Sequence, residues 1–246
     1  MPSTAQVRDR ATKRTRLAII ALIAGVVFLL AVIAVLLTSG GGSSKRPQAR
    51  QPAPTPPVSS APVSPDQWVQ LPDPGGYVDK TFPVRFPHKP EGGVAALVAS
   101  VQFGWSMDPA SNSRVTGLYA APQTAASAQK KAVDLASFWR QRIGVPATGP
   151  VPGDAAMRVV PIAVQWQPLD ANRTWAAVEV QVQSTPNSAT EPSEVITAVS
   201  AEMQWNPALR GGDWDYVPTA KVPPQTAQVD DPNFSHLGWR PLGAEH

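Results

Sequence analysis

Hydrophobic residues follow one another without a charge or a strongly polar group from Leu17 to Leu37, a run of 21 residues. About 20 apolar residues in a helix span the hydrocarbon core of a bilayer. Five basic residues precede the run, and segments rich in Lys and Arg stay on the cytoplasmic side. The pattern predicts a single transmembrane helix at 17–37 in the cell membrane, with a basic cytoplasmic tail at 1–16 and the C-terminal part outside.

A cleaved secretory signal peptide is the alternative, because it shares the basic start and the apolar stretch. The apolar core of such a signal is usually about 7 to 15 residues long. Here it has 21 residues and ends in Leu-Leu-Thr-Ser-Gly rather than in a small-x-small cleavage site. The uncleaved anchor is therefore the preferred interpretation, and the lipid bilayer is the first predicted partner.

Composition divides the rest of the chain into three segments. Residues 38–66 are rich in Gly and Ser and then in Pro, which is typical of an extended, disordered spacer. Apolar residues return in 67–217, which we expect to form a folded domain outside the cytoplasm. Residues 218–246 are again rich in Pro and are predicted to be an extended tail that lies partly on the domain through Phe234 and Trp239.

Two stretches of the domain repeat apolar residues with helical spacing. In 87–105, apolar residues recur at i, i+3, i+4, i+7 and i+11, which predicts a helix with one buried face. A longer helix is predicted over 123–143, between Pro122 and Gly144, which are the residue types expected before and after a helix. The segment 112–121 is ambiguous, and a short further helix is one interpretation of it.

After residue 153 apolar residues recur at every second position, which is the period of a strand. Four strands are predicted. Their apolar sets are Val160, Ile162, Val164 and Trp166; Ala176, Val178, Val180 and Val182; alternate residues of 195–205; and a short last strand at 213–217. Helices followed by antiparallel strands predict an α+β fold, with two or three helices packed on a curved four-stranded antiparallel sheet.

Composition also removes several classes of function. The chain has no cysteine, which excludes disulfides, thiolate catalysis and zinc sites built on cysteine. Residues 51–246 contain 13 basic and 17 acidic residues, so this part lacks the basic excess of a nucleic-acid-binding surface. Motifs for phosphate binding, zinc binding and nucleophilic catalysis are missing from the sequence. We therefore expect no cofactor, no metal and no nucleic-acid partner.

A few residues invite a catalytic interpretation. His88 and Glu91 stand at the start of the first helix, but one pair makes an incomplete site, and packing of the helix start is the preferred role for His88. An enzyme of this fold class would need a base in the concave pocket between sheet and helices. The carboxylates that come into question are Glu179, Glu202, Asp213 and Asp215. Glu179 and Glu202 alternate with the apolar faces of their strands and are expected to be solvated, so no catalytic residue is predicted.

Trp175 is the tryptophan that the alternation places opposite the apolar face of its strand. An exposed aromatic side chain on a sheet is a common anchor for a protein partner. The open alternative is that the tail covers it through Phe234 or Trp239. Trp175, Phe234 and Trp239 are thus the candidates for partner binding.

Two motifs carry a family resemblance. The segment Pro87-His88-Lys89-Pro90-Glu91-Gly92-Gly93-Val94-Ala95-Ala96 resembles the opening P-H-T-P-E-G-A-V-A-A of the first helix in small actinobacterial membrane proteins associated with mobile elements. Lys89 and Gly93 depart from that pattern. Gly212-Asp213-Trp214 resembles the G-D-W of their final strand, and the similarity covers roughly residues 77–217. The motif residues, Pro87, His88, Pro90, Glu91, Gly212, Asp213 and Trp214, are expected to have structural roles.

The order of elements resembles the cystatin-like, nuclear-transport-factor-like fold, whose anchored version occurs in bitopic inner-membrane scaffold subunits of type IV secretion and conjugation channels. The resemblance implies a non-enzymatic assembly component that binds other subunits or its own copies. The alternative is a domain that binds a small molecule or a cell-wall fragment, since this fold hosts binders and scaffolds alike. A pocket filled by side chains favours assembly, and an open cavity on the order of several hundred Å³ favours a ligand.

Overall fold

The computed structural model describes residues 68–185 and 192–243. The predicted anchor at 17–37, the tail at 1–16 and the spacer at 38–66 lie outside the described residues. Within the two described ranges, no helix is both long enough and apolar enough to cross a membrane.

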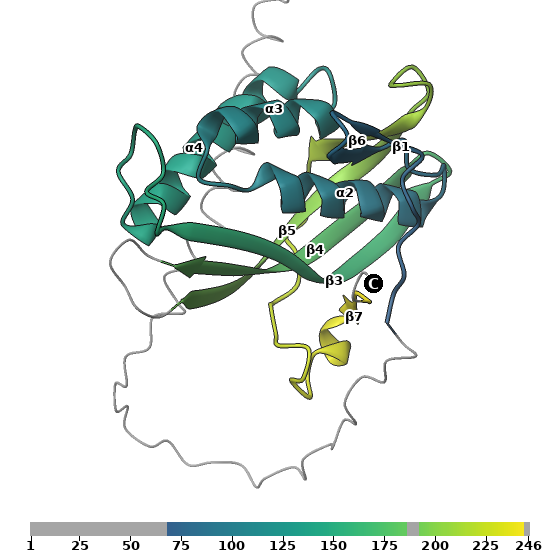
Figure 1. Ribbon diagram of the computed structural model, residues 1–246. Coiled ribbons are helices and arrows are strands. Elements are labelled where there is room, and N and C mark those ends of the chain that lie inside the picture. Colours follow the sequence, from purple (N-terminus) through teal and green to yellow (C-terminus); the bar gives the residue numbers. More distant parts are fainter. Residues whose placement is uncertain (1–67, 186–191, 244–246) are drawn as a thin grey trace, which may run out of the picture. The chain divides into compact units, whose positions relative to one another are not determined.

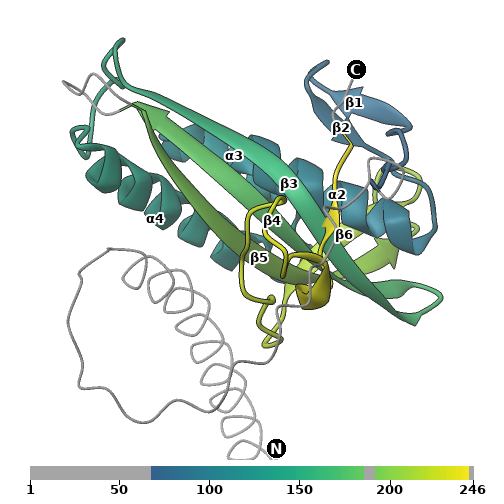
Figure 2. The same ribbon diagram turned by 90° about the horizontal axis from the view of Figure 1, so that it is seen from below.

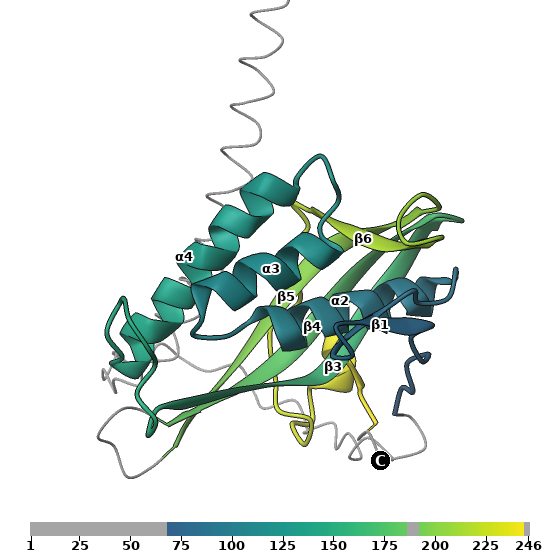
Figure 3. The same ribbon diagram turned by 45° about the horizontal axis from the view of Figure 1, so that its top comes forward.

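The described chain has a mixed α+β architecture in which the helices precede the main strands (Figure 1). In chain order the elements are β1 (Gly76–Val78), β2 (Phe82–Val84), α2 (Pro90–Gly104), α3 (Pro109–Tyr119), α4 (Ala125–Ile143), β3 (Ala156–Asp170), β4 (Arg173–Thr185), β5 (Ser193–Asn206), β6 (Asp213–Pro218), the short 3-10 helix η2 (Ser235–Leu237) and β7 (Arg240–Pro241). The three helices lie on one face of the curved sheet (Figure 3). The chain after β6 crosses the opposite face (Figure 2).

The three helices confirm most of the helical periodicity. α2 begins with Pro90 and Glu91 in its first turn, where a fixed φ and a negative charge are favourable. It is more buried than an amphipathic stripe requires, because it contacts α3 on one side and β3 and β4 on the other. The ambiguous segment is a helix, α3, whose first turn is capped by the Asp108 carboxylate. α4 ends at Ile143 and is capped by Gly144, which adopts a left-handed φ of 74°.

The main sheet has five strands in the order β6-β5-β4-β3-β7, and every pair is antiparallel. The four predicted strands are present, and β7, a piece of the C-terminal tail, adds a fifth that the strand periodicity did not indicate. An irregularity between Pro161 and Ala163 changes the register of β3. Val159 therefore packs in the core with Val164, and the prediction that Val160 shares the face of Val164 is wrong.

The space between helices and sheet is filled by side chains. Trp139 of α4, Tyr119 of α3, and Met203 and Trp214 of the sheet are each no more than 2% exposed and belong to one apolar cluster. Valines and alanines on the inner faces of β4 and β5 complete this cluster. The concave side of the sheet is thus occupied by the packed core of the domain.

The start of α2 provides a test of this packing. A Cβ added at Gly92 collides with the carbonyl oxygen of Pro87, a backbone atom that moves only with the chain. We expect Gly92→Ala to lower the free energy of unfolding by about 3 kcal/mol, as overpacking does. Urea unfolding of the full chain in mild detergent, followed by tryptophan fluorescence, measures this change.

Gly153→Ala is the matched control, because a Cβ there meets nothing within 4 Å and the residue has no left-handed φ. Its stability should change by less than about 1 kcal/mol, in the stabilising direction. Equal effects of the two substitutions would contradict the packing described for the start of α2.

Candidate functional site

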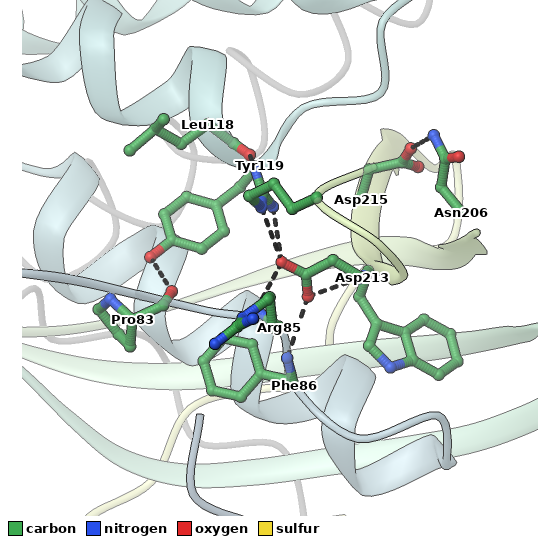
Figure 4. Close-up of polar contacts among 10 residues, drawn as sticks. Pro83, Arg85, Phe86, Leu118, Tyr119, Asn206, Asp213 and Asp215 are labelled. Atoms are coloured by element: carbon green, nitrogen blue, oxygen red, sulfur yellow. Dashed lines mark hydrogen bonds and ion pairs between the residues drawn. The ribbon is translucent and has the colours of Figure 1, made fainter. Parts of the chain in front are cut away.

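The buried carboxylate of Asp213, the first residue of β6, organises the corner where β2, α2 and β6 meet (Figure 4). Asp213 is 1% exposed. Its Oδ2 accepts hydrogen bonds from the backbone N–H of Arg85 at 2.6 Å and from Nε of Arg210 at 2.9 Å. Its Oδ1 accepts from the backbone N–H groups of Phe86 at 3.1 Å and Trp214 at 2.8 Å. Both oxygens are therefore saturated by donors that belong to the fold.

Two further bonds connect this corner to α3. Arg210 donates from Nη1 to the backbone carbonyl of Leu118 at 2.8 Å. The Tyr119 hydroxyl donates to the carbonyl of Pro83 at 2.7 Å, and burial raises the pKa of this tyrosine well above its usual range. The carboxylate of Asp213 thus reaches, through Arg210, the C-terminal end of α3.

The resemblance motifs meet at this corner, although they lie 127 positions apart in the chain. Trp214 donates from its indole Nε1 to the carbonyl of Pro87 at 2.9 Å. The His88 ring stacks on Trp205 with centroids 4.2 Å apart and an interplanar angle of 8°. His88 Nε2 lies 2.9 Å from Oδ1 of Asn172. The side chains of His88 and Trp214 therefore pack the start of α2 against the sheet, and His88 bonds to Asn172 instead of Glu91.

An open depression of about 430 Å³ lies beside this corner, at the β3–β4 turn. It is lined by Asp170, Ala171, Asn172, Arg173, Gln204 and Trp205. The Arg173 guanidinium donates to Asp170 at 2.7 Å and to Glu202 at 3.2 Å. The bond from Arg173 is the main reason that the pKa of Asp170 is lowered. These groups can bind a polar molecule by hydrogen bonds and by contact with the indole of Trp205.

None of the four acids singled out from the sequence stands alone in a pocket on the concave side. Asp213 is saturated, Glu202 forms an ion pair with Arg173, and Asp215 accepts a bond from Asn206 at 3.0 Å. Burial raises the pKa of Asp215. In residues 68–185 and 192–243, no group of three or more His, Asp or Glu side chains is placed to hold a metal ion.

Glu179 corrects an expectation. Its side chain was expected in solvent, but the residue is completely buried on the outer face of β4. The C-terminal tail covers it, and the backbone N–H of Ala227 donates to its Oε1 at 2.8 Å. Its other oxygen, Oε2, has no hydrogen-bond partner. Burial raises the pKa of Glu179 to about 7.

The three partner-binding candidates form one buried cluster. Trp175 is 4% exposed and packs with Phe234 and Trp239 of the tail, over Ala163 and Ala177 of the sheet. Of the two alternatives left open for Trp175, coverage by the tail is the one observed, and an exposed anchor is not. The three aromatic side chains are used to hold the tail on the sheet, and they are not available to a partner in this state.

Other contacts hold the tail on the same face. Trp239 donates from its indole nitrogen to the carbonyl of Gln225 at 2.8 Å. The Lys221 ammonium lies 3.7 Å from the ring centre of Trp175 and donates to Oε1 of Gln167 at 2.9 Å. The Lys221 ammonium over the Trp175 ring and the apolar cluster around Trp175 together hold the tail on the sheet.

Comparisons with protein-family models, with curated proteins and with solved structures find no match to this chain. The functional interpretation below therefore depends on the geometry of the described residues.

Replacing Asp213 should destabilise the domain strongly. In Asp213→Asn the half-buried Arg210 loses its counter-charge, and an amide nitrogen faces backbone N–H groups. We expect a loss of about 3 kcal/mol in the free energy of unfolding. Asp134→Asn, which removes an exposed carboxylate of α4 that lies 3.9 Å from Lys130, should cost less than about 0.5 kcal/mol. Urea unfolding of the full chain measures both, and equal losses would rule out the organising role of Asp213.

Glu179 should make stability depend on pH. Its pKa in the folded chain, about 7, exceeds the ordinary value of 4.5, so the folded state binds the proton more tightly than the unfolded state. This stabilising contribution is complete below about pH 4.5, falls as the pH rises through 7 and is absent above it. We expect a decline on the order of 2 kcal/mol between pH 4.5 and 8.

Glu179→Gln should remove that decline, because glutamine keeps an acceptor for the Ala227 N–H and does not titrate. Urea unfolding at pH 5 and pH 8 compares the two chains. Glu202→Gln, in the half-exposed ion pair with Arg173, is the control and should keep the decline of the native chain. An unchanged pH dependence in Glu179→Gln would show that other groups cause it.

Proposed function

We propose that this chain is a single-pass, membrane-anchored, non-enzymatic assembly component of an envelope complex, with conjugation or type IV secretion as the process. One observation supports this proposal above all. The concave side of the sheet, where an enzyme or a ligand-binding protein of this architecture would hold its substrate, is filled by Trp139, Tyr119, Met203 and Trp214. Without a substrate cavity on its concave side, the domain can act through its exposed outer surface, which can bind other proteins.

The rest of the domain fits a rigid building block. The Asp213 network joins β2, α3 and β6, and the tail closes the outer face of the sheet. With the predicted anchor at 17–37 and the predicted spacer at 38–66, such a block would be confined to a layer beside the bilayer. Confinement raises the effective concentration of co-anchored partners without any new contact.

A small molecule or a cell-wall fragment as ligand is the second candidate function, and the depression at the β3–β4 turn favours it. Its amide side chains, the Arg173 guanidinium and the indole of Trp205 suit a ligand rich in amide and hydroxyl groups. Saturable binding of a soluble peptidoglycan fragment to the full chain, abolished in Arg173→Ala, would favour this function over assembly.

Site-specific photo-crosslinking in intact native membranes tests the assembly proposal. Crosslinking residues are introduced at exposed positions of the domain, Val133, Leu169 and Val222. We expect at least one position to capture other subunits of one complex or further copies of the chain. The same position in the Asp213→Asn chain, which retains the predicted anchor but has a destabilised domain, is the control and should capture less. Adducts with lipid alone would count against the assembly proposal.

A further inference from the structure

One edge of the main sheet is left unpaired along half of a strand. β5 contains 14 residues, but β6 pairs only with Ala201–Asn206. After Pro218 the chain leaves this edge, and the Lys221 carbonyl accepts a bond from the Ser200 hydroxyl at 2.7 Å. Along 193–200, no described strand lies on the side of β5 that faces away from β4.

The backbone of this segment presents hydrogen-bonding groups outward. The N–H of Trp205 donates to the carbonyl of Asn172, on the β4 side. In an antiparallel ladder alternate residues bond to opposite neighbours, and the β4–β5 register has no irregularity. The odd-numbered residues of β5 therefore bond to β4. The N–H and C=O groups of Glu194, Ile196 and Ala198 point away from the sheet.

The other edge strands carry features that hinder pairing. On β3, β7 pairs only with Ala163 and Val164, with the N–H of Leu242 donating to the carbonyl of Ile162 at 2.9 Å, and the strand contains Pro161 and Pro168, each beside a register irregularity. On β6, the carbonyl of Tyr216 accepts from Ala121 at 3.0 Å. Proteins usually block exposed edges with such devices. Residues 193–200, Ser-Glu-Val-Ile-Thr-Ala-Val-Ser, contain no proline, no bulge and only one charge.

We propose that this edge pairs antiparallel with the same segment of a second copy of the chain, about a two-fold axis at Thr197. The pairing places Ile196 opposite Ala198 and Val195 opposite Val199 of the second copy. Glu194 lies opposite Ser200, so the single charge of the segment never meets its own copy. A strand that pairs with itself gives an isologous, closed dimer with one continuous sheet.

The proposed dimer would be one contact of the proposed assembly, and it rests on that proposed function. Copies anchored in the same membrane would meet at a high effective concentration. Pairing of the edge is measurable by itself. Crosslinks that identify a β5 dimer but no other subunit would support the pairing and contradict the proposal of a wider complex.

Engineered cysteines test the pairing, since the native chain has none. At the axis, two Thr197 residues would form a non-hydrogen-bonded pair with Cα atoms about 4.5 Å apart, within the range of a disulfide. Thr197 is 2% exposed in the single chain, so a cysteine there is shielded from random collision. We expect Thr197→Cys in the full, membrane-embedded chain to give a disulfide-linked dimer under mild oxidation with a small oxidant, because pairing of the edge brings the two thiols together. Tyr77→Cys is the control. Tyr77 is 60% exposed and belongs to the β1–β2 hairpin, on the far side of the sheet from β5 (Figure 2).

The register gives a stricter test. Val195→Cys and Val199→Cys should crosslink poorly when expressed alone. When the two chains carry different tags and are expressed together, they should form the mixed dimer at least about tenfold more efficiently than either forms its own. Equal crosslinking in all these chains and in Tyr77→Cys would mean random collision and would overturn the proposal.

Proline at Ile196 separates pairing from folding. It removes an N–H that points outward and leaves the ladder to β4 intact, as edge strands tolerate. Thr197→Cys combined with Ile196→Pro should lose the crosslink while its urea midpoint stays near that of Thr197→Cys. Ala198→Pro is the second variant if the first fails to fold. Persistence of the dimer in a folded proline variant, or absence of the crosslink in Thr197→Cys, would overturn the proposed pairing.

Discussion

The carboxylate of Asp213 is the constraint on which the rest of the domain depends. It lies where the segment before α2 meets β6, and it satisfies two backbone N–H groups that no strand partner reaches. Buried N–H groups without an acceptor are costly. With Asp213 in place, Trp214 is held at the carbonyl of Pro87, and α2 is fixed at its first turn. The helices then lie where they fill the concave side of the sheet.

The local elements could be predicted from the sequence because each depends on its own periodicity and end residues. The helix over 123–143, with Gly144 after it, and the strand alternation in 176–182 are both present. The change of register in β3 could not be predicted, since the extra residue near Ile162 leaves the apolar pattern unaltered and only the pairing reveals it. The motif residues around Pro87 and Trp214 were found as separate signals, and only the fold shows that they touch.

The outer face of the sheet was misjudged for a physical reason. Alternation predicts a half-buried sheet with polar residues in solvent, which assumes that nothing covers the second face. Here the residues that meet the tail include alanines such as Ala163 and Ala177, which give a weak hydrophobic signal. The proline-rich composition of 218–246 indicated an extended tail, and an extended chain can cross a sheet. Glu179 is therefore buried although its position in the pattern is that of a solvated residue.

The outer face of the sheet, which the tail covers, and the edge of β5, which no strand covers, both bear on where a partner can bind. The tail takes up the aromatic side chains that were candidates for binding a partner, so the outer face is closed. The concave face is closed by the core. In the described residues, the depression at the β3–β4 turn is open, and the outward backbone groups of β5 along 193–200 have no strand partner. The side chains of the depression already form hydrogen bonds with one another, whereas the outward backbone N–H and C=O groups of Ile196 and Ala198 have no strand partner. Backbone pairing needs only an extended segment, which the same chain supplies in a second copy.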